Sequence, residues 1–175
     1  MQIIIDGYNL IRQSDRLRAF DRRSLEEGRN ALIQFLAPYK RAKGHAITVV
    51  FDAWDGGSPL EERDRQAGIE MVYSRRGRKA DDVIKAMVEK RTGVETLVVS
   101  SDRDVADYAL HRGVSALSSP EFERAVLRFY TLESRSAVNE EAEEEERPGK
   151  GTKKKGPSHR MSRGAKDYQK KISKL

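Results

Sequence analysis

The chain contains no cysteine, and only three histidines and one tryptophan among its 175 residues. The lack of cysteine excludes disulfides, thiol nucleophiles and Cys-based zinc sites, and it is compatible with a reducing cytoplasm. The histidines, His45, His111 and His159, are scattered and form no ligand pattern. Any bound metal is therefore expected to be a hard cation held by carboxylates.

Long hydrophobic runs are missing as well. No apolar stretch approaches the roughly 20 residues that a membrane-spanning helix needs. The N-terminus opens on a strand pattern with no basic lead-in, which is unlike a signal peptide. We therefore expect a cytoplasmic protein that does not engage a membrane, with enough length for one domain and appendages.

Charge is distributed unevenly behind a formal net charge of +6. The stretch "EEAEEEE" carries six acids and no base, whereas Arg147 to Leu175 contains eleven Lys and Arg and one Asp. Such one-sided segments generally stay disordered or serve as interaction arms. We predict a globular domain over 1–133, an acidic linker over 134–149, and a disordered basic tail over 150–175.

The body of the chain alternates strand and helix patterns. Strands are expected at 2–6, 45–54, 68–74, 95–102 and 114–119, and helices from Ser24 onward and at 80–93, 102–113 and 119–130. Helices that alternate with strands in this way predict a three-layer, Rossmann-like α/β fold with a central, mainly parallel sheet.

Acids stand where the expected strands end. Asp6, Asp52 and Asp102 each close a strand, and the pair Asp81–Asp82 opens a helix. Because the carboxyl ends of parallel strands lie along one edge, Asp6, Asp102 and the pair are expected to converge in an acidic pocket. Clustered carboxylates repel one another, and bound Mg²⁺ or Mn²⁺ is the usual way to neutralise them.

Each acid also has a plainer explanation. Asp6 can cap the turn or a helix that follows it through its own hydrogen bonds. Asp81 and Asp82 suit a helix N-terminus through the helix dipole, and Asp102 can cap its helix. Asp104 fits a solvated first-turn acid, and Asp52 allows either reading. The conjunction of acids at one edge favours function, and Asn9 is a polar companion able to orient a water or a carboxylate.

Four segments resemble a known family. "IIIDGYNLI", "VVFDA", "ADDVIKAM" and "VVSSDRDVADYA", in this order and spacing, resemble the YacP-like branch of the NYN domains, within the PIN-like nuclease superfamily. The resemblance covers roughly residues 1–133. It implies a PIN/NYN fold and a metal-dependent endoribonuclease that acts on single-stranded RNA.

The resemblance also implies a site. Its catalytic residues would be Asp6, Asn9, Asp81, Asp82 and Asp102. Mg²⁺ or Mn²⁺ would be held by Asp6, Asp81 and Asp102, with Asp82 completing the shell and Asp104 as a weaker candidate. The loop "WDGGSPLEERDRQ" and the charged tail lie outside the resemblance.

Basic residues suggest where RNA would lie. Arg75, Arg76, Arg78 and Lys79 immediately precede the acid pair, and Arg12 follows "DGYNLI". These side chains would hold phosphates near the cleavage point. The alternative for the first four is a solvated basic loop, but four bases with one glycine favour the functional reading. The tail offers a nucleic-acid-binding arm that includes Lys153, Lys154, Lys155, Arg160 and Arg163.

Two functions follow from these patterns. The first is a metal-dependent endoribonuclease acting on mRNA or rRNA in decay or processing; the second is a non-catalytic module that binds RNA or the ribosome through its tail. A phosphate-accepting receiver is weaker, because the third and fifth strands end in "MVYS" and "ALSS" without the required Asp and Lys. The patterns leave open RNA against DNA, the number of metal ions and the oligomeric state.

Overall fold

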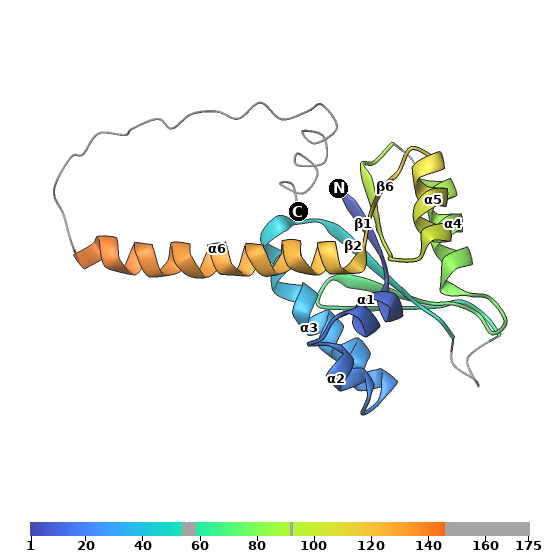
Figure 1. Cartoon of the computed structure of the whole chain (residues 1–175), viewed down its shortest axis with the longest axis horizontal. Coiled ribbons are helices and arrows are strands. Elements are labelled where there is room, and N and C mark those ends of the chain that lie inside the picture. The colour runs from blue at the N-terminus through green and yellow to red at the C-terminus, as the bar shows by residue number, and fades with distance from the viewer. Residues whose placement is uncertain (54–58, 92, 146–175) are drawn as a thin grey trace. The chain divides into compact units, whose positions relative to one another are not determined.

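The computed structural model describes residues 1–53, 59–91 and 93–145, shown in colour in Figure 1. The chain divides into two compact units, Met1–Arg124 and Ala125–Leu175. The first unit contains the whole sheet and all the described acids of the predicted site.

Six strands and six helices are formed by the described residues. In chain order they are β1 Gln2–Asp6, α1 Gly7–Gln13, α2 Arg18–Asp21, α3 Leu25–Lys43, β2 Ala46–Phe51, β3 Glu62–Gln66, β4 Ile69–Tyr73, α4 Ala80–Lys90, β5 Thr96–Val99, α5 Arg103–His111, β6 Ser115–Leu117 and α6 Ser119–Glu145.

The strands form one sheet in the order β3-β4-β2-β1-β5-β6. All neighbouring pairs are parallel except β3 and β4, which are antiparallel. The predicted α/β fold with a mainly parallel sheet is therefore confirmed. The central strand β1 carries Ile3, Ile4 and Ile5 fully buried, as expected for a strand covered on both faces.

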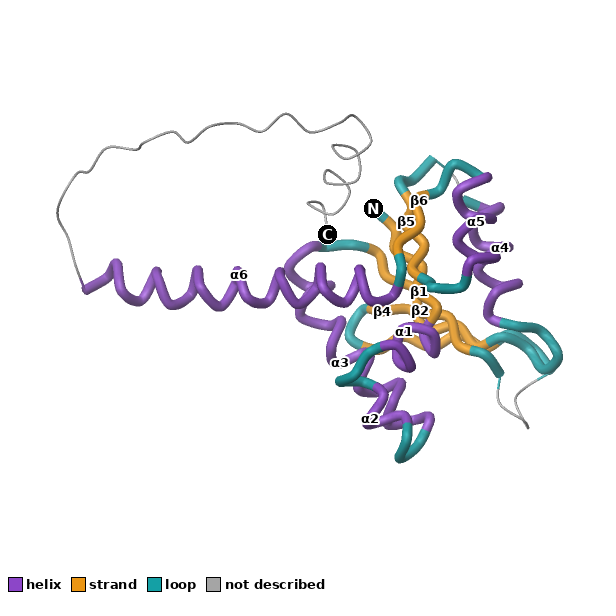
Figure 2. Tube along the Cα trace, viewed as in Figure 1, coloured by secondary structure: helices purple, strands orange, loops and turns teal. Residues whose placement is uncertain are grey.

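Helices cover the sheet on both sides (Figure 2). On one face, Ile4, Val50, Val72 and Val98 from four adjacent strands pack in one core with the apolar residues of α4 and α5. Because side chains alternate along a strand, Ile3 and Ile5 point to the other face, where α1 and α3 lie. The three predicted layers are thus present, and the carboxyl ends of the parallel strands share one edge.

The chain enters α1 directly from β1, with Asp6 as the N-cap of the helix. A Cβ on Gly7 would lie 2.3 Å from Cε1 of Phe51, so only glycine allows this approach. Ser24 caps α3 by accepting a hydrogen bond from the Glu27 N–H at 3.0 Å, in agreement with the predicted start.

One strand was absent from the sequence prediction. β3 has the sequence "ERDRQ", which has no apolar alternation, and it lies at the sheet edge, where charged side chains are tolerated and discourage further pairing. Ala67 and Gly68 join it to β4 with φ angles of 52° and 77°, the left-handed values of a tight hairpin turn.

The last helix runs to Glu145, further than the predicted end near residue 130. Among the described residues, no helix is both long enough and apolar enough to cross a bilayer.

Candidate functional site

Asp6 is the buried acid at the carboxyl end of β1. Its side chain has 7% exposure and accepts two hydrogen bonds, from the Asn9 N–H to Oδ1 and from the Ser100 hydroxyl to Oδ2, both 3.1 Å long. Burial raises its pKa from 3.8 to about 6; these hydrogen bonds act against the shift, while the charges of Asp81 and Asp52 add to it. Asp6 is thus a carboxylate held in place but poorly compensated.

Ser100 connects Asp6 with Asp102. Its buried hydroxyl donates to Asp6 and accepts from the Asp102 N–H at 3.1 Å. Asp102 caps α5, because its Oδ1 accepts from the backbone N–H groups of Asp104 and Val105. Its Oδ2 accepts no hydrogen bond from the described residues, so capping leaves one oxygen available to a ligand. The sequence analysis did not select Ser100, although "VVSSD" placed it at a strand end.

Asn9 links three segments through one oxygen. Its Oδ1 accepts from the Ser101 N–H at 3.0 Å, from the buried Ser119 hydroxyl at 2.7 Å and from Gln13 Nε2 at 3.3 Å. Its backbone N–H, rather than its amide, orients Asp6. Asn9 therefore fixes the β5–α5 loop that carries Ser100 and Asp102 relative to the end of β1.

The charges of Asp52 and Asp81 also act on Asp6. Asp52 Oδ1 accepts from the Ala80 N–H at 2.6 Å and so caps α4 from the end of β2. Asp81, in the first turn of α4, is half-buried; burial raises its pKa, and the charges of Asp102 and Asp52 raise it further. The charge of Asp81 thus acts on Asp6 and that of Asp102 on Asp81, while Asp52, which the sequence left undecided, acts on both Asp6 and Asp81.

The remaining predicted acids lie differently. Asp82 is exposed, and its main-chain carbonyl accepts a hydrogen bond from Arg78 Nη2 at 3.1 Å. Asp104 is exposed and ion-paired with Lys85, so its charge is already balanced. Both acids have less claim to a shared ligand than Asp6 or Asp81.

The predicted basic residues border this edge. Arg75, Arg76 and Arg78 lie in the exposed loop between β4 and α4, and the charge of Lys79 opposes the rise in the pKa of Asp81. Arg12 lies over the Tyr8 ring, 5.2 Å from its centroid, with its Nε 4.0 Å from Asp21. The tail candidates lie outside the described residues: Lys153, Lys154, Lys155, Arg160 and Arg163.

The donor set suits a hard cation chemically, although its side chains are not gathered as a ligand cage. In the three described ranges, no group of three or more His, Cys, Asp or Glu side chains is placed to hold a metal ion. The charge of Asp81 nevertheless adds to the raised pKa of Asp6, and a cation would relieve this repulsion. Mg²⁺ commonly takes one or two carboxylates and keeps several waters, so a full cage is not required.

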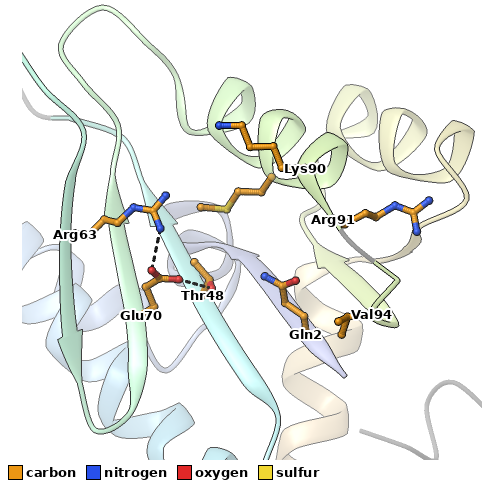
Figure 3. A pocket seen from close by; sticks show the side chains of 8 residues that line it. Gln2, Thr48, Arg63, Glu70, Lys90, Arg91 and Val94 are labelled. Atoms are coloured by element: carbon orange, nitrogen blue, oxygen red, sulfur yellow. Dashed lines mark hydrogen bonds and ion pairs between the residues drawn. The ribbon is translucent and has the colours of Figure 1, made fainter.

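The opposite end of the sheet carries a different arrangement. A hollow of about 250 Å³ lies at the amino ends of β1, β2 and β4 (Figure 3). Glu70 accepts from Arg63 Nη1 and from the Thr48 hydroxyl, each at 3.0 Å, as the dashed lines in Figure 3 show. Its acid is paired, unlike those at the carboxyl edge.

Known proteins resemble this chain in sequence and in fold. A family model described as YacP-like NYN domain matches residues 3–174, beyond the 1–133 that the motifs covered. The Bacillus subtilis protein YacP is 28% identical over 115 residues, spanning 66% of this chain and 67% of that protein.

Two solved structures of Rae1 (YacP) from Bacillus subtilis are similar in fold. One has a TM-score of 0.66 at 26% identity and covers 82% of this chain and 83% of that one. A mutant of the same protein has a TM-score of 0.68 at 24% identity and covers 81% of this chain and 84% of that one.

Proposed function

Because the chain belongs to the YacP-like NYN domain family, with the fold of the PIN-like nucleases, we propose that it is a metal-dependent endoribonuclease that cleaves single-stranded RNA. The observation that carries the proposal is the coupling of Asp6, Asp81 and Asp102 at one sheet edge, with basic residues beside them. Its substrates would be mRNA or rRNA in the cytoplasm.

Mg²⁺ or Mn²⁺ would be held by Asp6 and Asp81, with the free oxygen of Asp102 and the carboxylates of Asp52 and Asp82 nearby to orient its waters. When bound, the ion would offset the carboxylate charges and stabilise the charge that develops on the scissile phosphate. Attack of water on phosphorus would leave a 5′-phosphate and a 3′-hydroxyl.

The chain's own groups position this reaction. Ser100 and the Asn9 N–H fix the Asp6 carboxylate so that its lone pairs point in a constant direction. Arg75, Arg76, Arg78 and Lys79 would hold the phosphates on one side of the cleaved bond.

A second candidate is a non-catalytic module that binds RNA or the ribosome. The family match through residue 174 favours some role for the basic tail, since the match does not stop at the sheet domain. Both candidates predict RNA affinity that falls with salt. They differ only in cleavage.

The test is cleavage of end-labelled single-stranded RNA in Mn²⁺, Mg²⁺ or EDTA. We expect metal-dependent cutting by the wild type that is lost in Asp6→Asn and Asp102→Asn. Glu70→Gln, an acid substitution at the opposite edge, is the matched control and should cut normally. A folded wild type that binds RNA, alone or with ribosomes, and never cuts it would favour the binding module.

A further inference from the structure

A second hollow, of about 590 Å³, lies between α2 and α3 in the first unit. Its apolar lining includes Leu17 and Phe20 from the α2 region and Ala31 from α3. The Phe20 side chain is 42% exposed, and the Arg23 guanidinium lies 5.7 Å from its ring centroid. An exposed aromatic ring beside an arginine is the arrangement on which unpaired bases stack.

Two amides border the same hollow. Asn30 and Gln34 lie four residues apart on α3 and therefore on the same face of the helix. Both are exposed, and neither side chain hydrogen-bonds to any described residue. A side-chain amide offers both donors and an acceptor, which is what the edge of a base requires.

The charge around the hollow favours an anionic ligand. Arg18 pairs with Asp15 and Arg23 with Glu27, at 2.8 and 3.7 Å. Arg16 lines the hollow, is exposed and pairs with no acid among the described residues. Glu27 lines it too, but its charge is paired with Arg23. One uncompensated arginine, an exposed aromatic ring and two free amides at one hollow match the parts of a nucleotide.

The hollow is also connected to the acid edge. Helix α1 begins immediately after Asp6, and its Arg12 reaches Asp21 at the end of α2. Helix α1 thus leads from the end of β1 toward α2, whose residues line the hollow.

We propose that this hollow is a nucleobase subsite for single-stranded RNA. One base stacks on Phe20, Asn30 and Gln34 bind its edge, and Arg16 holds the adjoining phosphate. The inference rests on the proposed function only for the class of ligand, since binding at this subsite requires neither the metal nor cleavage.

The test uses short single-stranded RNAs, each with one 2-aminopurine at a different position, in EDTA so that no cleavage occurs. Stacking on Phe20 quenches the fluorescence of one position. Phe20→Ala should remove that quenching and weaken binding about tenfold, whereas Phe20→Tyr should retain both. Leu110→Ala, which truncates a 56% exposed residue on α5, is the matched control and should change neither.

An abasic nucleotide at the quenched position gives an independent check. It should weaken wild-type binding by the same factor and leave Phe20→Ala binding unchanged, because the two changes remove one contact. Asn30→Ala and Gln34→Ala should alter the preference among bases at that position more than overall affinity.

Several outcomes would overturn the proposal. One is equal quenching of 2-aminopurine in Phe20→Ala and wild type. Another is a further loss of affinity when Phe20→Ala binds the abasic RNA, so that the two losses add. A change in oligomeric state or in protease protection of the tail upon Phe20→Ala, with RNA binding unchanged, would assign the hollow to a second copy or to the chain's own tail. Normal quenching by a protein that never cuts RNA would overturn the proposed function alone.

Discussion

The two ends of the sheet treat acids in opposite ways. At the amino ends, Glu70 meets the Arg63 guanidinium and the Thr48 hydroxyl, so its charge is balanced where it lies. At the carboxyl ends, Asp6 and Asp81 meet other acids, and burial together with that repulsion raises the pKa of both. A carboxylate is thus balanced by a positive charge at one end and repelled by other carboxylates at the other.

Whether an acid is paired therefore distinguishes a structural acid from a functional one better than its mere presence at a sheet edge. A paired carboxylate needs nothing further, whereas buried carboxylates that repel one another lower the stability of the folded chain until a ligand relieves them. The carboxyl edge is therefore the end of the sheet where selection for stability alone would have removed charge.

The largest expected effect comes from comparing Asp81 with Asp104. Asp81→Asn should reduce RNA cleavage about a thousandfold, the order of several kcal/mol that metal-assisted charge stabilisation supplies. Asp104→Asn should reduce it less than about tenfold, because Asp104 is exposed and already paired with Lys85. Single-turnover cleavage rates measure both.

Equal losses in the two variants would contradict the comparison, since exposure and pairing would then not separate the acids. Circular dichroism spectra and thermal melting of both variants serve as the control for folding.

The next effect concerns stability and its dependence on pH. Asp6 has a folded pKa of about 6, above the ordinary 3.8, so between these values the folded chain keeps a proton that the unfolded chain releases. Stability contributed by Asp6 must therefore fall as pH rises through this window, by about 3 kcal/mol in all. Asp6→Asn removes the fall and should be the more stable protein above pH 6.

Urea unfolding of both proteins in EDTA from pH 4 to pH 8 measures this difference. Taking wild type minus variant cancels the other titrating groups. A difference that stays constant with pH, or one that favours the wild type at pH 8, would show that Asp6 is compensated after all.

The positions of the acids at the strand ends could be predicted from the sequence, because they follow from the topology of a parallel sheet. Asp6 and Asp102 follow apolar β-strand patterns, and parallel strands bring their ends to one edge whatever the detailed packing. Asp81 was reachable for a similar reason, as the start of a clear amphipathic helix. Asp52 had the same signal, but its capping of α4 across the chain depends on how β2 and α4 pack, which no local pattern contains.

Elements that lack a hydrophobic periodicity could not be predicted from the sequence. β3 is charged throughout and exists because β4 offers it an edge. Helix α1 depends on the close approach of Gly7 to Phe51, and these two residues lie far apart in the sequence. Ser100 was missed for another reason: a serine at a strand end has many ordinary uses, and only its two hydrogen bonds identify it as the link between Asp6 and Asp102.

The smallest effect is expected at the amino edge. Arg63 makes ion pairs with Glu61 and Glu70, both 3.0 Å long, but its side chain is 56% exposed, so water and salt screen both. Arg63→Gln should therefore cost no more than about 1 kcal/mol of unfolding free energy, and less in high salt. RNA cleavage should be unchanged, because β3 is the outermost strand, separated from β1 by β4 and β2, and the Arg63 guanidinium is held by Glu61 and Glu70. A tenfold loss of cleavage with normal stability would show that the amino edge also contacts RNA, and pairing of charges would no longer mark the inactive end of the sheet.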